Sequence, residues 1–392
     1  MKLKRKISII ALAILLFNCR NNNEVQASNK SNVAVLLETS KSHPHPTKNA
    51  EIVFCLDATG SMGGLIGTAK EKIWDIVSEL AQDGDIDTLK LGMVFYRDRG
   101  DSFVTKQIAM TTDLDDVYSE LLEIGAAGGG DSPESVNQGL YEAITQMQWS
   151  SDKKTYRTVF VVGDCPPHMD YQDDVKYTES CKLATKKGIT INTIKLGNAC
   201  REAIPHFRNM ASCTNGEFLM LDQNAKDYVV ATPYDDEINR LSRNIDDTRM
   251  YYGDKELREV NYSKKAKSMA VYDSGSTTAN SARAEYKQSK TGQKVAYGTQ
   301  EIISDYDSGK LNLEEIEDDK LPENLKGKSL EEKEIIVKEQ SEKRKVDNTK
   351  LKDLLKKKRE YINKKASEET DKPSFSKDVL KVMKKQANKK AS

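Results

Sequence analysis

The chain has 392 residues, and its 61 basic and 61 acidic side chains give a formal net charge of zero at pH 7. This balance excludes a global field that would draw the protein to nucleic acid or to an anionic surface. Apolar residues make up 37% of the chain and charged residues 31%, which is too polar for a single uniformly packed globule. The length therefore allows one large domain and a second region of different character.

The first residues are typical of an export signal. Basic residues, among them Lys4 and Arg5, precede an apolar run at residues 7–17 that is too short to span a bilayer as a helix. The run ends in Leu16-Phe17-Asn18-Cys19, which resembles a bacterial lipobox and implies a lipoprotein signal peptide at residues 1–18 with lipidation of Cys19. Ordinary cleavage after Val25-Gln26-Ala27 is the alternative and would give a secreted protein. We expect the protein to lie in the bacterial cell envelope, where its lipid would anchor it to a membrane on the periplasmic side or at the cell surface.

A loop rich in side-chain oxygens follows the first expected strand. Residues 19–50 are rich in Asn, Ser, Lys and Pro and predict a linker, after which an unbroken apolar run at residues 52–56 ends in Asp57-Ala58-Thr59-Gly60-Ser61. Such a run indicates a parallel strand covered on both faces, and ligands of open α/β sheets bind just beyond the carboxyl ends of these strands. Oxygens of Asp57, Thr59 and Ser61, at spacing i, i+2 and i+4, can face one hard cation such as Mg²⁺.

Two other interpretations of this loop are open. One of Asp57, Thr59 and Ser61 can serve merely as the N-cap of the helix that follows. An aspartyl phosphotransferase also places an acid after a strand, but it needs a second acid two residues later as general acid. Thr59 occupies that position and cannot act as an acid at neutral pH, which disfavours the enzyme.

Helical and strand patterns alternate after this loop. We expect helices at residues 62–80, 114–124, 136–147, 174–186 and 201–211, and strands at 89–96, 103–110, 158–163, 189–196 and 217–221. This spacing predicts an α/β fold with a doubly wound, mostly parallel, six-stranded sheet. The strand at residues 158–163 ends, like the first, in an acid, Asp164.

Three ordered segments carry a resemblance to a known family. Asp57-Ala58-Thr59-Gly60-Ser61 resembles the D-x-[ST]-x-S motif of von Willebrand factor type A domains, which carry a metal-ion-dependent adhesion site. Gly128-Gly129-Gly130-Asp131-Ser132-Pro133-Glu134 and Asp164-Cys165-Pro166-Pro167-His168 resemble loops of a bacterial and protist branch of that family. The resemblance implies a type A domain, Rossmann-like in fold, at residues 51–225.

The same resemblance implies a ligand set for the cation. Thr59 and Ser61 would bind it directly, and Asp57 and Asp164 would bind it directly or through water. The implied cofactor is Mg²⁺, or else Mn²⁺ or Ca²⁺, and its open coordination position would accept an Asp or Glu carboxylate from a protein partner. We therefore expect an exported, metal-ion-dependent protein-binding module, for adhesion or as a scaffold, that is not an enzyme. The alternatives are a scaffold with a vestigial metal site that acts through its C-terminal region, and a metal-dependent hydrolase.

The middle loop departs from the family's common pattern, which places a Thr there. The candidate ligands are Asp131 and Ser132, since the three glycines before them allow the backbone to approach an ion closely. Alternatively, Asp131 is an N-cap with Glu134 reaching back to it, because Asp-x-x-Glu before an apolar-striped helix mimics a capping box. His168 is expected to be a structural or rim residue rather than a catalyst.

The cysteines indicate which disulfide bonds the protein could form. Without Cys19 an odd number remains, and Cys55 in the first strand is expected to be buried as a small apolar residue. Disulfides form in exported proteins, and Cys200 and Cys213 bracket a helix near the sheet edge, so we predict a disulfide between them. The sequence has no C-x-x-C pair, so a zinc or redox motif has no support.

The character of the chain changes towards its C-terminus. Residues 226–392 are expected to be helical, lysine-rich and partly disordered, with flexible linker composition at residues 275–281. Ser329-Leu330-Glu331-Glu332 matches a capping box at the start of a helix, and Leu351 and Leu355 belong to a narrow apolar stripe later in it. Such a helix could form a coiled coil with a partner helix or bind an anionic surface, but a solvated helical tail is the favoured interpretation.

Overall fold

The computed structural model describes residues 48–82, 86–130, 132–223, 230–368 and 374–391. The expected signal peptide, the lipidation site Cys19, nearly all of the linker and the candidate ligand Asp131 lie outside these residues. Within the described part of the chain, every helix is too short or too polar to cross a membrane.

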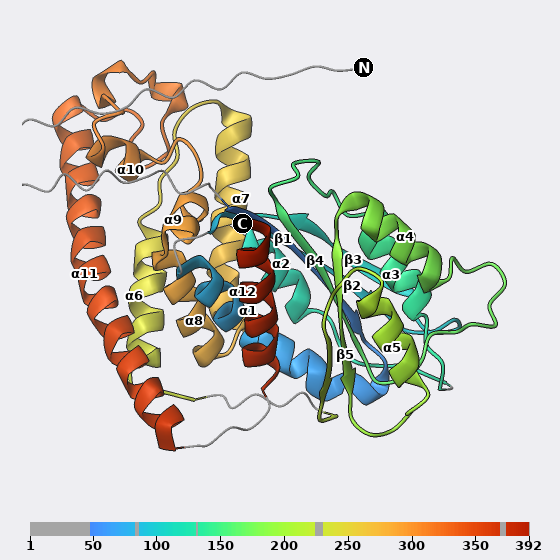
Figure 1. The fold of residues 1–392 in the computed structure, drawn as a ribbon. Coiled ribbons are helices and arrows are strands. Elements are labelled where there is room, and N and C mark those ends of the chain that lie inside the picture. The colour runs from blue at the N-terminus through green and yellow to red at the C-terminus, as the bar shows by residue number, and fades with distance from the viewer. Residues whose placement is uncertain (1–47, 83–85, 131, 224–229, 369–373, 392) are drawn as a thin grey trace, which may run out of the picture. The chain divides into compact units, whose positions relative to one another are not determined.

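A six-stranded sheet forms the centre of the first half of the described chain (Figure 1). The strand order is β3-β2-β1-β4-β5-β6, and every neighbouring pair is parallel except β2 and the antiparallel edge strand β3. This arrangement confirms the predicted doubly wound, mostly parallel sheet. The strands are β1 (Lys48–Asp57), β2 (Ile86–Tyr96), β3 (Thr105–Thr111), β4 (Tyr156–Gly163), β5 (Thr190–Leu196) and β6 (Phe218–Leu221).

Helices cover both faces of the sheet. On one side lie α1 (Gly63–Gln82) and α2 (Leu114–Leu122), and on the other α3 (Val136–Thr145), α4 (Tyr177–Lys187) and α5 (Ala203–Ser212). Alternate residues of β1 therefore enter different cores: Phe54 packs on the α1 side, and Val53 and Cys55 pack on the α3 side. Two buried faces explain why the β1 sequence is an unbroken apolar run.

The C-terminal region is a set of packed helices. They are α6 (Asp235–Asp247), α7 (Lys255–Ser274), α8 (Thr277–Gln288), α9 (Lys290–Ala296), α10 (Ile302–Asp307), α11 (Leu330–Glu368) and α12 (Phe375–Ala391). Phe375, Val379 and Met383 of α12 join the same apolar core as α1 and β1. The prediction of a solvated tail is therefore wrong for these residues, because the apolar positions of α12 fall on one buried stripe.

The expected linker at residues 275–281 is also wrong, since most of this segment is the first turn of α8. The Ser276 side chain accepts a hydrogen bond from the Ala279 amide at 3.1 Å and caps the helix. Ala279 and Ala282 are buried against α1, and the Ser78 hydroxyl of α1 donates to the Ala282 carbonyl at 3.1 Å. Small residues that resemble a linker in composition here allow two helices to approach closely.

Helix α11 begins and packs as its sequence indicates. The Ser329 amide donates to the Glu332 carboxylate at 2.8 Å, and the Glu332 amide donates to the Ser329 hydroxyl at 3.3 Å, which confirms the predicted capping box. Leu351 and Leu355 of the apolar stripe are buried against α6 of the same chain.

Candidate functional site

The loop after β1 holds three side-chain oxygens in contact. Asp57, the last residue of β1, is fully buried, and its Oδ1 accepts hydrogen bonds from the Thr59 amide at 2.9 Å and the Thr59 hydroxyl at 2.6 Å. The hydroxyl oxygens of Thr59 and Ser61 lie 3.3 Å apart. Thr59 precedes the short 3₁₀ helix Gly60–Met62 and makes no side-chain cap bond to it. Asp57 Oδ2 has no hydrogen-bond partner.

Asp164 follows β4, the strand next to β1 in the sheet. The parallel register pairs Leu56 with Val162, so the acids that follow these strands reach the same edge. Asp164 is buried, and its Oδ2 accepts a hydrogen bond from Gln223 Nε2 at 2.8 Å, whereas its Oδ1 has no partner. A Cβ atom at Gly163 would clash with the Tyr96 hydroxyl and would lie 3.2 Å from Asp57 Oδ2, so glycine is needed at this position.

The glycine-rich loop lies directly against the loop after β1. The Gly60 amide donates to the Gly128 carbonyl at 3.0 Å, and Gly129 has a positive φ of 84°. A Cβ atom at Gly129 would lie 3.1 Å from the Thr59 Cβ. The glycines therefore allow this loop to approach the loop after β1 closely. Of the two candidates in this loop, Asp131 lies outside the described residues and Ser132 is exposed to solvent.

The structure instead brings Glu134 to the site. It is 4% exposed, its Oε1 would lie 3.5 Å from a Cβ at Gly129, and its Oε2 has no hydrogen-bond partner. Helix α3 begins at Val136 with Ser135 as N-cap, so Glu134 precedes the helix and the capping-box interpretation of this segment is wrong. The Glu134 amide donates to the Pro166 carbonyl at 2.9 Å, which fixes the residue against the loop after β4.

Glu134 does not stand out in the sequence as a site residue, because the Asp-x-x-Glu spacing fits a helix cap equally well. Whether Glu134 belongs to a helix cap or to the site depends on which residue begins the helix. The local sequence pattern does not determine that residue. A usable signal was the proline at position 133, since the residue before a proline is biased away from the helical region.

The buried acids of these three loops repel one another. Burial raises the pKa of Asp57 to about 7, against hydrogen bonds from Thr59 that lower it, and Asp164 raises it further. Burial also raises the pKa of Glu134 to about 9, with contributions from Asp57, Asp98 and Asp164. Burial and neighbouring acids therefore both act against the ionised forms of these two carboxyls.

The donor set fits a hard divalent cation. Within the described ranges, no three His, Cys, Asp or Glu side chains are placed to hold a metal ion by themselves, so hydroxyls or water would have to complete the coordination. Thr59 and Ser61 supply such hydroxyls, and Mg²⁺ characteristically keeps several waters. Three buried carboxylate oxygens without a partner, one each from Asp57, Glu134 and Asp164, are atoms that a cation would satisfy.

A second group of side chains fixes the loop that carries Glu134. His168 is buried between two carboxylates, with Nδ1 2.8 Å from Asp170 Oδ1 and Nε2 3.3 Å from Asp98 Oδ2. Its ring stacks on Tyr171 with centroids 3.8 Å apart. Asp98 accepts a hydrogen bond from the Ser135 hydroxyl at 2.9 Å, and the His168 amide donates to the Glu134 carbonyl at 3.1 Å. His168 therefore positions the loop.

The disulfides differ from the prediction. Cys200 is bonded to Cys165, with Cα atoms 5.0 Å apart, and Cys213 is bonded to Cys181, with Cα atoms 5.9 Å apart, so the predicted Cys200–Cys213 bond is wrong. These two cysteines lie beyond opposite ends of the ten-residue helix α5, which separates them by roughly 15 Å. Such a separation is too large for a disulfide. Cys55 is a free, buried thiol, as expected.

The fold and the site together define a doubly wound α/β domain with an oxygen-rich loop cluster at the carboxyl edge of its central strands. Residues 51–230 match the family model described as von Willebrand factor A domain. This part of the chain is a von Willebrand factor A domain.

Curated relatives match about three tenths of the chain. A von Willebrand factor A domain-containing protein 7 from Rattus norvegicus is 33% identical over 121 residues, which are 31% of this chain and 12% of that protein. A putative ariadne-like RING finger protein R811 from Acanthamoeba polyphaga mimivirus is 27% identical over 118 residues, which are 30% of this chain and 11% of that protein. The chain thus spans about an eighth or less of the length of these relatives.

Among solved structures, proximal thread matrix protein 1 from the mussel byssus aligns with a TM-score of 0.34 at 15% identity, covering 45% of this chain and 43% of that one. A structure of the same mussel protein with a zinc-occupied MIDAS motif aligns with a TM-score of 0.33 at 14% identity, covering 44% of this chain and 42% of that one.

Proposed function

We propose that the protein is an exported module that binds a protein partner through a divalent cation, Mg²⁺ or Mn²⁺, held at the carboxyl edge of β1 and β4. The observation that carries this proposal is the set of three partnerless, buried carboxylate oxygens on Asp57, Glu134 and Asp164. They belong to three loops that meet beside the hydroxyls of Thr59 and Ser61.

Each loop would have a separate part in holding the ion. Thr59 and Ser61 would supply hydroxyl ligands, and the carboxylates of Asp57, Glu134 and Asp164 would bind directly or through water. Thr59 is buried whereas Ser61 is exposed, so the site opens towards solvent on the Ser61 side. When bound, the cation supplies an open coordination position for an Asp or Glu carboxylate of the partner.

We propose binding rather than catalysis because the bases near the site are already engaged. His168 contacts two carboxylates, and the buried Lys195 ammonium donates to the backbone carbonyls of Leu196, Gly197 and Ala199. Neither base is placed beside a hydroxyl or thiol nucleophile in the contacts described above.

The proposal of export is supported by the disulfides. Two disulfide bonds in one domain are typical of an oxidising compartment. Together with the lipobox-like segment at the N-terminus, they favour a location in the bacterial cell envelope, with the lipid on Cys19 as membrane anchor.

The experiment is capture of partner proteins from the native envelope on immobilised protein, in Mg²⁺ and in EDTA, combined with calorimetric titration by Mn²⁺. Binding of Mn²⁺ and EDTA-sensitive capture, both lost in Ser61→Ala and kept in the control Ser119→Ala, are the expected results. Failure to bind Mn²⁺ would contradict the proposal and favour a vestigial site. An EDTA-sensitive phosphatase or protease activity would favour the hydrolase instead.

A further inference from the structure

A covalent link joins the segment after β4 to the loop after β5. Cys165 directly follows Asp164, and its disulfide partner Cys200 lies between β5 and α5. The same segment also fixes Glu134, whose amide donates to the Pro166 carbonyl at 2.9 Å. Two of the three buried carboxylates proposed to hold the cation therefore depend on the position of one segment, and this disulfide anchors that segment.

The other contacts restrain this segment less firmly. Asp164 Oδ2 accepts a hydrogen bond from Gln223, whereas its Oδ1 has no hydrogen-bond partner. Pro166 and Pro167 have no backbone N–H group and cannot donate hydrogen bonds that would fix the segment. Beyond the end of β4, the covalent bond at Cys165 is therefore the strongest restraint on the position of the Asp164 carboxylate.

The loop that carries Cys200 is fixed by contacts of its own. The ammonium of the buried Lys195 donates to the backbone carbonyls of Leu196 and Gly197 at 2.9 Å each. It also donates to the Ala199 carbonyl. Cys200 has a φ of 44°, which is uncommon for a residue with a side chain and persists where the surrounding structure holds it. The disulfide thus ties the segment after β4 to a rigid loop.

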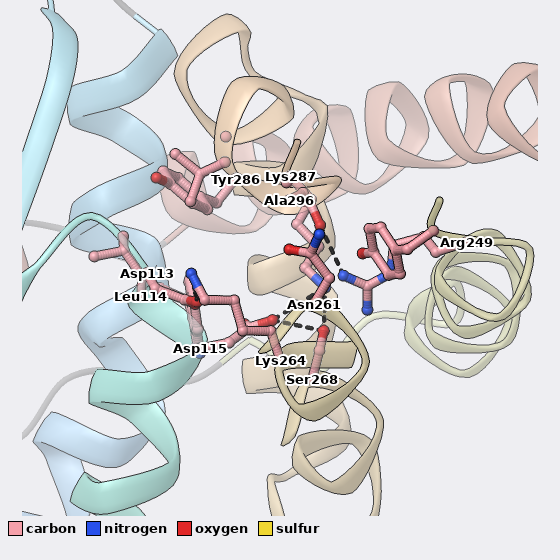
Figure 2. Close-up of a pocket in the computed structure, with 15 residues that line it drawn as sticks. Asp113, Leu114, Asp115, Arg249, Asn261, Lys264, Ser268, Tyr286, Lys287 and Ala296 are labelled. Carbon is pink, nitrogen blue, oxygen red and sulfur yellow. Dashed lines mark hydrogen bonds and ion pairs between the residues drawn. The ribbon is translucent and has the colours of Figure 1, made fainter. Parts of the chain in front are cut away.

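The packing of the C-terminal helices lies away from the proposed cation site. Figure 2 shows the pocket between these helices and α2, where Asp115 accepts a hydrogen bond from the Ser268 hydroxyl of α7 at 2.6 Å. The residues that line this pocket, all in the described part of the chain, include none of the proposed cation ligands. The disulfide, in contrast, begins at the residue next to Asp164.

The Cys165–Cys200 bond can be opened by thiol–disulfide exchange. Cys165 is 9% exposed and Cys200 is half-buried, so Cys200 offers the more accessible sulfur. A thiolate of a dithiol attacks this sulfur and forms a mixed disulfide, and Cys165 leaves as a thiolate that takes up a proton. The second thiol of the reductant then displaces Cys200 as a thiol. The dithiol becomes a disulfide and passes two electrons and two protons to the protein.

We propose that the Cys165–Cys200 disulfide is a redox switch of the cation site, which holds its cation while the bond is closed and loses it when a dithiol reduces the bond. Reduction would free the segment that carries Asp164 and fixes Glu134. Groups that orient metal ligands typically contribute about 10- to 100-fold to metal affinity. The inference rests on the cation site proposed above and adds that this site is complete only in an oxidising compartment.

The second disulfide provides a matched control. Cys213 lies at the opposite end of α5 from Cys200, roughly 15 Å away, and is bonded to Cys181 of α4. The bonded cysteines are 32 residues apart in this disulfide and 35 residues apart in Cys165–Cys200. Because the stabilisation by a cross-link depends on loop length in the chain-entropy model, loss of either bond should lower global stability by a similar amount. A difference in cation affinity between the two variants therefore reports the local effect.

The test is calorimetric titration of Mn²⁺ into the oxidised full-length protein, as wild type, as Cys165→Ser/Cys200→Ser and as the control Cys181→Ser/Cys213→Ser. The wild type and the control should bind Mn²⁺ with the same affinity. Cys165→Ser/Cys200→Ser should bind it about 10- to 100-fold more weakly.

A second measurement does not depend on the folding of Cys165→Ser/Cys200→Ser. In the control variant, Cys165–Cys200 is the remaining disulfide of the described residues. Dithiothreitol, removed under nitrogen before the titration, would open this bond, and alkylation with mass spectrometry would verify the two thiols. The Mn²⁺ affinity should fall on reduction and recover on reoxidation.

The outcomes separate this inference from the proposed function. Unchanged Mn²⁺ affinity in Cys165→Ser/Cys200→Ser or in the reduced control variant would overturn the switch and leave the cation site in place. An equal loss of affinity in the oxidised control variant would also overturn it, because the effect would then be one of global stability. A wild type that does not bind Mn²⁺ would overturn both the switch and the cation site.

Discussion

Replacement of Asp57 by Asn tests the proposed cation site while keeping the hydrogen bonds that Asp57 makes in the fold. Asp57 Oδ1 accepts hydrogen bonds from the amide and hydroxyl of Thr59, and the carbonyl oxygen of an Asn side chain can accept both. The amide nitrogen then replaces Oδ2, the oxygen that has no partner, and a cation cannot bind it. Asp57→Ala would be a poorer test, because it would leave two buried Thr59 donors without an acceptor, at about 1–3 kcal/mol each.

The expected magnitude follows from binding linkage. A cation present at about 100 times its dissociation constant adds about 2.7 kcal/mol to the free energy of unfolding. For a domain of this size each kcal/mol shifts the melting temperature by roughly 2–4 °C, so the wild-type shift should be about 5–11 °C. Asp57→Asn should fold without the cation and show no shift when it is added.

The assay is thermal unfolding in EDTA and in millimolar Mg²⁺ or Mn²⁺, for the wild type, for Asp57→Asn and for the control Asp75→Asn. Asp75 pairs with Lys72 on α1, and the control variant should keep the full wild-type shift. A wild-type melting curve that does not change with metal, or an Asp57→Asn variant that still responds, would refute the reasoning.

Three further predictions concern other parts of the chain. Glu134→Gln should lower the Mn²⁺ affinity about 10- to 100-fold by calorimetry, and the exposed control Glu123→Gln should leave it unchanged. Met383→Ala in the buried stripe of α12 should cost about 2–5 kcal/mol in denaturant unfolding, and Met220→Ala, at a side chain 43% exposed, about 0.5 kcal/mol or less. Burial raises the pKa of Asp246, but its cationic neighbours lower it to about 2, below the unfolded value of about 3.9. Its contribution of about 2–3 kcal/mol should therefore be present above about pH 4 and be lost as the pH falls towards 2, and Asp246→Asn should flatten that loss in acid titrations of stability.

Local patterns determined the sheet and two of its acid-ended strands. The unbroken apolar run before Asp57 and the similar run before Asp164 reflect burial of each strand on both faces. This pattern can be recognised within the sequence of each strand alone. Parallel pairing then brings both carboxyl ends to one edge, so these acids could be placed together without knowledge of the packing. The capping box at Ser329 and Glu332 was likewise readable, because its two hydrogen bonds join residues three positions apart.

Other features depend on contacts between segments far apart in the chain, and the sequence by itself could not determine them. The partners of Cys200 and Cys213 follow from which loops face the two ends of α5. Glu134 reaches the site because the loop after β4 holds its backbone in place. The C-terminal helices are packed because the stripe on α12 meets a complementary face of α1, although their composition is that of a solvated tail. Local sequence fixes the period of a helix or strand, whereas the choice of its partner is a property of the assembled fold.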